Sequence, residues 1–144
     1  QRQMCIRDRQ KYYLQAIQAY IPELEIYYGH YLTHQIRAKL VNPEPGKSST
    51  ALVYKTEEKG SDVNLALHLL NDAWLNLYDC AVLVSNDSDL AYALQLVKNH
   101  HNKKVGLIFP NVDKKRRPSR QLVEHADFVK QIRSSVLESS QLPD

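Results

Sequence analysis

The stretch that decides the fold is residues 57–109, which read EEKGSDVNLALHLLNDAWLNLYDCAVLVSNDSDLAYALQLVKNHHNKKVGLIF. Apolar residues in its first half recur at i, i+3, i+4 and i+7, which predicts an amphipathic helix over residues 62–77 with Ser61 as its N-cap. Residues 80–84 are continuously apolar, typical of a strand buried on both faces, and residues 104–109 form a second apolar strand. Helical spacing between these strands indicates an α/β fold with a largely parallel sheet and helices on both faces.

Shorter elements are predicted on either side of this stretch. The strand expected just before it would begin the alternation of strands and helices, and Trp74 with the leucines of the long helix would lie in the core. The expected elements are a helix at 10–20, one or two strands within 24–41, a turn or flexible loop at 42–50, a strand at 51–56, a loop at 110–118, a short helix from Ser119 to about Ala126, and a frayed tail at 133–144.

Length and composition exclude several classes of protein. The chain has 144 residues, enough for one domain, and its four glycines form neither a dinucleotide-binding G-x-G-x-x-G turn nor a P-loop. It has no apolar run long enough to cross a membrane, and its first ten residues are too polar for a signal peptide. Of its two cysteines, Cys80 is expected to be a small buried hydrophobe. We therefore expect a soluble, cytoplasmic protein without a membrane partner.

The formal net charge of +3 is concentrated in one short segment. Residues 111–120 read NVDKKRRPSR, whereas the rest of the chain carries almost balanced charges. A local basic patch of this kind is suited to the phosphates of a polyanion such as RNA, although a solvated surface loop is the alternative. The candidate phosphate contacts are Lys114, Lys115, Arg116, Arg117 and Arg120.

Acidic residues follow the predicted strand at 80–84. Asp87 and Asp89 come just beyond its carboxyl end, and Asp62 lies at the start of the preceding helix. In an open α/β sheet, ligands bind at the carboxyl ends of the strands, so three carboxylates could converge there and hold Mg²⁺ or Mn²⁺. Ser85 and Ser88 would add hydroxyl groups. The alternative is that these residues are ordinary helix caps.

These motifs resemble the NYN domain, in the LabA-like branch of the PIN-like nucleases. That branch typically reads E-K-G-x-D-V at a helix start, then an apolar strand ending in S-G-D-S-D, then a strand and a short helix with A-D-x-F. The resemblance covers roughly residues 9–130. The matching residues are Glu58, Lys59, Gly60, Asp62, Val63, Ser85, Asp87, Ser88, Asp89, Ala126, Asp127 and Phe128, with Asn86 where the family usually has glycine.

The resemblance implies a PIN-like Rossmannoid three-layer sandwich and metal-dependent hydrolysis of RNA. Asp62, Asp87 and Asp89 would hold Mg²⁺ or Mn²⁺, and Ser85 and Ser88 would contact the substrate together with the basic segment. Glu58 and Asp127 would have structural or accessory roles. The family's first strand and its acid are not matched, so we expect a domain at 10–132 that lacks this strand, an opening segment at 1–9 that is foreign to the domain, and a possible homodimer.

Two other functions fit the same residues. A catalytically silent RNA-binding or regulatory module would keep the sheet and the basic segment without hydrolysis. A phosphatase or other phosphotransfer enzyme would use the D-S-D pair, although Ser85 and Asn86 separate it from the strand end. In any of these proteins the tyrosines could either stack on unpaired bases or pack against the sheet; they include Tyr12, Tyr13, Tyr27, Tyr28 and Tyr31.

Overall fold

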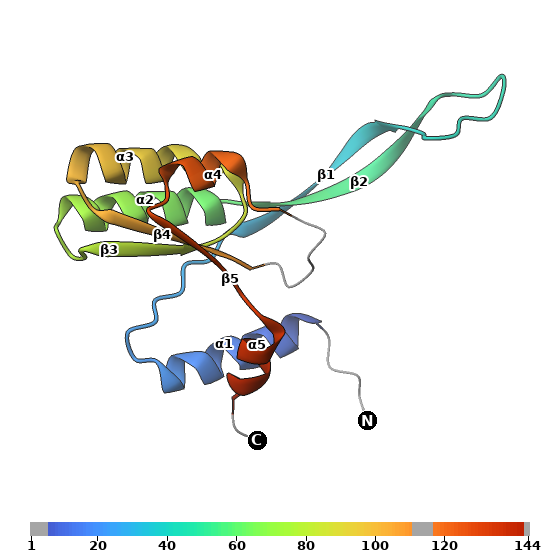
Figure 1. The fold of residues 1–144 in the computed structure, drawn as a ribbon. Helices are drawn as coiled ribbons and strands as arrows, with labels where there is room; N and C mark the ends of the chain where they lie inside the picture. Colours follow the sequence, from blue (N-terminus) through green and yellow to red (C-terminus); the bar gives the residue numbers. More distant parts are fainter. Residues whose placement is uncertain (1–5, 111–116, 143–144) are drawn as a thin grey trace.

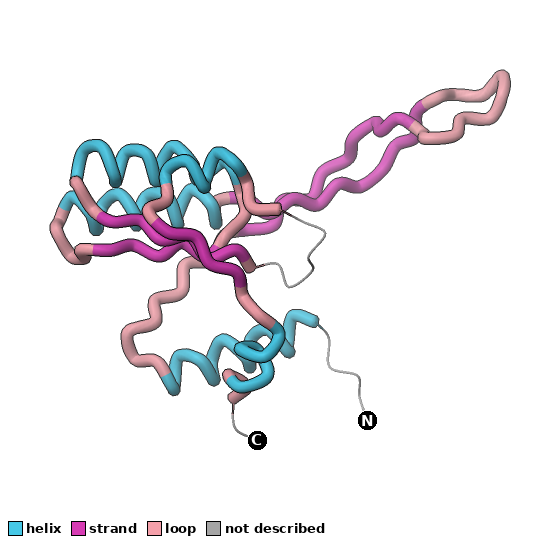
Figure 2. The backbone as a smooth tube through the Cα atoms, in the orientation of Figure 1, coloured by secondary structure: helices cyan, strands magenta, loops and turns pink. Residues whose placement is uncertain are grey.

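The structure is a computed structural model, and it describes residues 6–110 and 117–142. Figure 1 shows the chain as a ribbon and Figure 2 as a tube coloured by secondary structure. The elements are α1 (Ile6–Tyr20), β1 (His30–Lys39), β2 (Thr50–Lys59), α2 (Ser61–Trp74), β3 (Cys80–Val84), the 3₁₀ helix η1 (Ser88–Leu90), α3 (Ala91–His101), β4 (Lys104–Phe109), α4 (Arg120–His125), β5 (Phe128–Gln131) and α5 (Ser134–Ser139). The frayed tail predicted at 133–144 therefore contains the short helix α5.

A parallel three-stranded sheet of order β3-β4-β5 is the centre of the fold. Helices α2, α3 and α4 lie together on one side of this sheet (Figure 1). Alternate residues of β3 and β4 point toward the helices. Their side chains and those of the helices form an apolar core between the two layers. Its fully buried members are Leu90, Leu94, Val97, Val105, Leu107 and Leu122. The mixed α/β fold with a parallel sheet agrees with the sequence prediction.

Strand β3 is buried on one face only. Ala81 and Leu83 are buried against the helices, whereas Val82 and Val84 are 49% and 54% exposed and Cys80 is exposed. The predictions of a strand buried on both faces and of a buried Cys80 are wrong. An apolar run is compatible with either arrangement, since hydrophobicity alone does not say how many faces are covered. The predicted second layer of helices over this face is not confirmed.

Helix α2 leaves much of its apolar stripe in solvent. It packs against α3 and η1, burying Ala73 and partly burying Leu69 and Leu70. Trp74 and Leu67 are 77% and 59% exposed. The Trp74 ring makes an edge-to-face contact with the His101 ring, with the ring centroids 5.8 Å apart. The prediction that Trp74 and the whole leucine stripe lie in the core is wrong, because the stripe is wider than the surface that α3 and η1 cover.

Strands β1 and β2 form an antiparallel hairpin that projects from the rest of the molecule (Figures 1 and 2). Their register pairs His30 with Lys59 at the base and Lys39 with Thr50 near the tip. The strand predicted at 51–56 therefore exists, but its predicted place in the parallel sheet is wrong. The loop of residues 40–49 after β1 returns the chain alongside that strand, and the antiparallel pairing makes the two strands a hairpin. We call residues 30–59 the arm.

In the described part of the chain, no helix combines the length and the apolar character that a membrane span needs.

Candidate functional site

The acidic motif forms a tight loop, residues 85–89, at the carboxyl end of β3. The backbone N–H of Asp87 donates to Oγ of Ser85 at 3.0 Å, and the backbone N–H of Asp89 donates to Oδ1 of Asp87 at 3.0 Å. Asp87 is thus the N-cap of η1, which begins at Ser88. These bonds fix the loop from within, and they give Asp87 the capping role that was the ordinary alternative to a metal ligand.

Asn86 ties this acidic loop to the end of the basic segment. The backbone N–H of Ser119 donates to Oδ1 of Asn86 at 2.7 Å. Arg117 lies two residues before Ser119, and Arg120 begins α4 directly after it. The structure therefore brings the segment of two predicted phosphate-contacting residues to the acidic loop, whereas Lys114, Lys115 and Arg116 lie outside the described residues. The sequence analysis does not predict this role for Asn86. The feature that could have indicated it is the side-chain amide of Asn86, a hydrogen-bond acceptor at a position where the family usually has glycine.

Asp62 occupies the first turn of α2. Within residues 6–110 and 117–142, no group of three or more histidine, cysteine, aspartate or glutamate side chains is arranged to hold a metal ion. Asp87 and Asp89 therefore share the acidic loop, but Asp62 does not complete a three-carboxylate group with them. The described oxygen donors do not by themselves fit the set of clustered carboxylates that Mg²⁺ or Mn²⁺ would need.

Glu58 stabilises the start of α2. Its Oε1 accepts hydrogen bonds from the backbone N–H of Ser61 at 3.3 Å and from the Ser61 hydroxyl at 2.6 Å. The helix N-cap is Gly60, whose φ of 98° is left-handed, so the prediction of Ser61 as N-cap is wrong. Gly29 makes room for this carboxylate, because a Cβ there would collide with Oε1 of Glu58. These contacts agree with a structural role for Glu58.

Asp127 joins the sheet to α3 at the other end of the strands. Its Oδ2 accepts from the backbone N–H of Val105 at 2.7 Å, and its Oδ1 forms an ion pair with Nζ of Lys98 at 2.8 Å. The hydrogen-bonded Lys98 ammonium and the Val105 amide hold the pKa of this carboxyl below its ordinary value. Asp127 pairs with the amino end of β4, away from the acidic loop, which agrees with its structural alternative.

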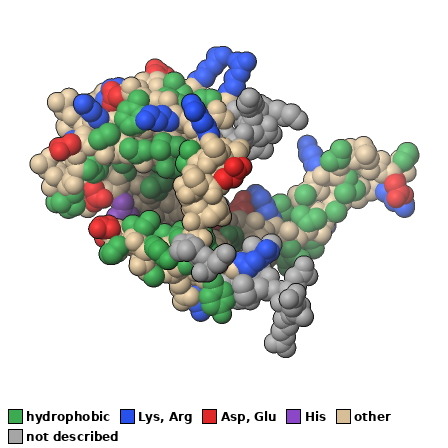
Figure 3. Space-filling view, turned by 60° about the horizontal axis from the view of Figure 1, so that its bottom comes forward, with side chains coloured by type: hydrophobic (Ala, Val, Ile, Leu, Met, Phe, Trp, Pro, Cys, Tyr) green, Lys and Arg blue, Asp and Glu red, His purple; other side chains and the backbone are tan. Residues whose placement is uncertain are grey.

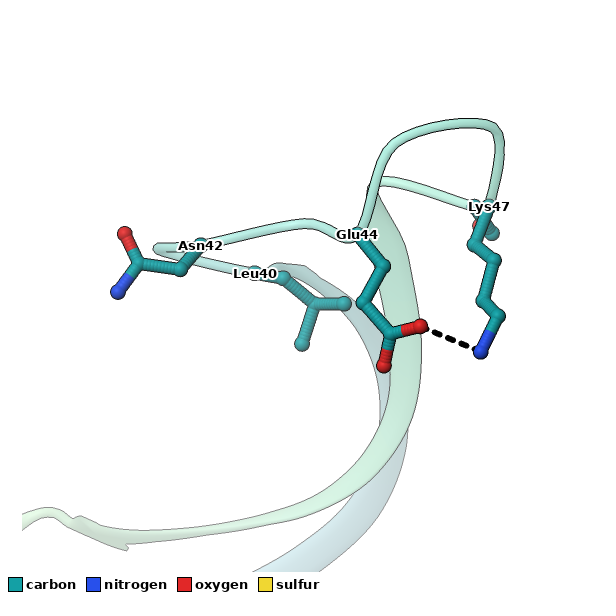
Figure 4. A pocket seen from close by; sticks show the side chains of 5 residues that line it. Leu40, Asn42, Glu44 and Lys47 are labelled. Atoms are coloured by element: carbon teal, nitrogen blue, oxygen red, sulfur yellow. Dashed lines mark ion pairs between the residues drawn. The ribbon is translucent and has the colours of Figure 1, made fainter.

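A surface hollow of about 480 Å³ lies at the tip of the arm (Figure 4). It is lined by Leu40, Asn42, Glu44, Lys47 and Ser48, and Glu44 forms an ion pair with Lys47 across the turn. All of its lining residues come from one exposed turn and its flanks. The hollow contains none of the predicted site residues, so we do not assign it to the functional site.

A sequence profile of the NYN domain matches residues 8–132. The chain belongs to the NYN domain family. This membership confirms the family resemblance seen in the E-K-G-x-D-V, D-S-D and A-D-x-F motifs. The acidic loop, from Ser85 to Asp89, lies within the matched residues and is therefore part of the NYN domain.

The NYN domain is similar to two proteins of known sequence or structure. It is 34% identical over 126 residues to 6-hydroxy-3-succinoylpyridine 3-monooxygenase HspA of Pseudomonas putida (strain DSM 28022 / S16), a match that spans 83% of this chain and 40% of that relative. A crystal structure of a protein of unknown function from Vibrio parahaemolyticus RIMD 2210633 aligns with a TM-score of 0.55 at 19% identity, over 91% of this chain and 65% of that one. The second likeness shows the shared fold.

Proposed function

We propose that this NYN domain is a metal-dependent RNA nuclease. The observation that carries the proposal is the hydrogen bond between Ser119 and Asn86, which fastens a segment bearing Arg117 and Arg120 to a loop bearing Asp87 and Asp89. Adjacent carboxylates and guanidinium groups are what a phosphodiester substrate requires, since the cations bind phosphate and the carboxylates hold a metal ion or a water molecule.

In this proposal each side chain has a separate task. Arg117 and Arg120 contact phosphates of the RNA, and Ser85 and Ser88 offer hydroxyl groups beside them. Asp87 and Asp89 would hold Mg²⁺ or Mn²⁺ at the acidic loop, whereas Asp62 forms no three-carboxylate group with them among the described side chains. When bound, such an ion polarises the scissile phosphate and lowers the pKa of a bound water.

The test is cleavage of labelled single-stranded RNA by the wild type and by Asp87→Asn with Mg²⁺, with Mn²⁺ and with EDTA. Asparagine also caps helices, so this substitution removes the charge while keeping the bond that shapes η1. We expect cleavage to require the metal ion and to fall about 100-fold or more in Asp87→Asn. Asp79→Asn is the matched control, since Asp79 is exposed before the amino end of β3. Equal cleavage by wild type and Asp87→Asn would overturn the proposal for Asp87.

A catalytically silent RNA-binding module is the second candidate. The lack of a three-donor group among the described side chains favours it. Such a module binds RNA with a strong salt dependence but shows neither metal binding nor cleavage. Calorimetric titration with Mn²⁺ separates the two candidates, because only the nuclease takes up the ion at Asp87.

The likeness to HspA raises a third candidate, oxidation of a pyridine substrate. The 34% identity is its support, although the chain spans 40% of that protein. Oxygen consumption in the presence of 6-hydroxy-3-succinoylpyridine and a reductant tests it directly. Consumption that depends on this substrate, without RNA cleavage, would replace the nuclease proposal.

The finer architecture also remains a proposal. A three-layer PIN-like sandwich is supported by the parallel order of the sheet and by the exposed apolar side chains of Val82 and Val84, which a further layer or a second copy in a homodimer would cover. Sedimentation of the purified chain measures whether it is a monomer or a dimer.

A further inference from the structure

One face of the arm gathers aromatic, polar and basic side chains. Residues that are directly paired in antiparallel strands point to the same face of the sheet. The register therefore separates the arm into two faces, of which one carries two tyrosines and two cations. We call it the aromatic face; it comprises Tyr31, Thr33, Gln35, Arg37 and Lys39 of β1 with Thr50, Leu52, Tyr54, Thr56 and Glu58 of β2.

The two tyrosines of this face do not pack against the protein. Tyr31 is 76% exposed and Tyr54 is 75% exposed, which excludes for them the alternative that such tyrosines fill the core. Figure 3 shows apolar side chains, tyrosine included, on the surface along the projecting arm. Exposed aromatic rings on a sheet are the usual means by which proteins stack on unpaired bases.

Side-chain hydrogen bonds between β1 and β2 orient residues on this face. Oη of Tyr54 accepts from Nε2 of Gln35 at 3.1 Å, and the hydroxyls of Thr33 and Thr56 are 2.9 Å apart between the two tyrosines. Gln35, the partner of Tyr54, is four residues from Tyr31 on β1, so the backbone positions of the two tyrosines are separated by about 14 Å along the strands. This spacing leaves room for more than one nucleotide of an extended strand between them.

The charge of the aromatic face is complementary to a phosphate backbone. Arg37 and Lys39 lie on it toward the tip, and neither takes part in the ion pairs found in the described part of the chain. Two acids of the arm form ion pairs with lysines of the arm: Glu44 pairs with Lys47, and Glu57 pairs with Lys55 and Lys59. Glu58, at the base, accepts its bonds from Ser61.

We propose that the aromatic face of the arm is a binding site for single-stranded RNA, in which Tyr31 and Tyr54 stack on unpaired bases and Arg37 and Lys39 contact phosphates. The choice of RNA rests on the proposed function. A double helix does not fit this site, because its bases are already stacked on one another and are not available to the tyrosine rings. The arm thus extends the substrate-binding surface well beyond the acidic loop.

The test is the affinity of a fluorescent uridine oligonucleotide of about 12 nucleotides, measured by anisotropy in EDTA so that no cleavage occurs. Replacing Tyr31 and Tyr54 together by isoleucine keeps β-strand preference and apolar area but removes the rings. We expect this variant to lose affinity at least about tenfold, while the double phenylalanine variant binds like the wild type. Tyr20→Ile, at an exposed position of α1, is the matched control and leaves affinity unchanged.

The cations are tested by the salt dependence of the same binding. Removing one phosphate contact to a single strand lowers the slope of log K against log salt by about 0.7, so Arg37→Gln and Lys39→Gln should each reduce it by that amount. An unchanged slope in both variants contradicts their role.

Two results would overturn the proposal. One is equal RNA affinity of the wild type and the double isoleucine variant. The other is a loss of self-association in that variant with RNA affinity intact, which would make the face an interface between copies of the chain. A failure of the nuclease proposal gives a different result: the wild type then shows no metal-dependent cleavage of RNA but still binds RNA in EDTA.

Discussion

The backbone N–H of Ser119 donates to Oδ1 of Asn86 at 2.7 Å, joining residues 33 positions apart in the sequence. Neither residue belongs to the acids or the cations that first indicate a site. Their hydrogen bond nevertheless determines where the segment with Arg117 and Arg120 lies relative to Asp87.

Asn86→Ala removes this acceptor and should have a larger effect on RNA cleavage than on stability. Loss of one hydrogen bond at an exposed position costs about 1 kcal/mol of unfolding free energy. Cleavage should fall further, because the basic segment is no longer fixed to the acidic loop. Asn86→Asp keeps an oxygen acceptor and is the control in thermal melting, whereas Asp79→Asn, away from the acidic loop, is the control for cleavage. Wild-type cleavage by Asn86→Ala would contradict the positioning role.

The ion pair of Asp127 with Lys98 predicts a pH-dependent stability. The folded pKa of Asp127 lies below the unfolded value, so its contribution is present above the unfolded pKa and is lost as the pH falls through the folded pKa. Asp127→Asn should lower Tm at pH 7, and the difference from the wild type should shrink in acid. Asp79→Asn should leave Tm nearly unchanged at both pH values, since the Asp79 carboxylate is fully exposed and its ion pair with Lys103, at 3.5 Å, contributes little. A pH-independent difference for Asp127→Asn would refute this reasoning.

The raised pKa of Tyr78 leads us to expect that folding stability decreases at alkaline pH. Its hydroxyl donates to the backbone carbonyl of Leu69 at 2.7 Å, and burial, with the nearby Asp72, raises its pKa to about 12. Because the folded pKa exceeds the unfolded value of about 10, stability should decline as the pH rises from about 10 to 12. Denaturant unfolding of Tyr78→Phe should show a shallower decline over that range, whereas Tyr20→Phe should follow the wild type.

Two neighbouring residues of β3 test whether its other face is open. Leu83 is 4% exposed and Val82 is 49% exposed. Leu83→Ala should cost about 2–5 kcal/mol of unfolding free energy, as in other cores, and Val82→Ala less than about 1 kcal/mol. Urea unfolding measures both. A cost for Val82→Ala as large as that for Leu83→Ala would mean that the second face of the sheet is covered in solution.

Phe128 covers Gly106 on the neighbouring strand. A Cβ at position 106 would collide with the Phe128 ring, so Gly106→Ala should cost about 1–3 kcal/mol of unfolding free energy. Combining it with Phe128→Leu should recover part of that cost, because the smaller side chain clears the added methyl group. Strictly additive costs in the double variant would show that the two residues do not meet.

The sequence predicted those elements whose signal is local. The strands at 80–84 and 104–109 and the helix containing Leu94 and Val97 have strong periodicity, and they appear in the structure with nearly the expected bounds. The acidic loop followed from the D-S-D motif at a strand end. What stayed hidden depends on contacts between distant residues: the pairing partner of β2, the exposed face of Val82, and the bond from Ser119 to Asn86.

The hairpin of residues 30–59 also divides the molecule into two units of unequal cooperativity. Its strands bond to each other, whereas the core around Leu94 and Leu107 lies in the helices and the parallel sheet. Opening of the hairpin therefore exposes amides without disturbing that core. Amide hydrogens of β1 and β2 should exchange with deuterium at a low opening free energy, while those of β4 exchange only when the whole sheet unfolds.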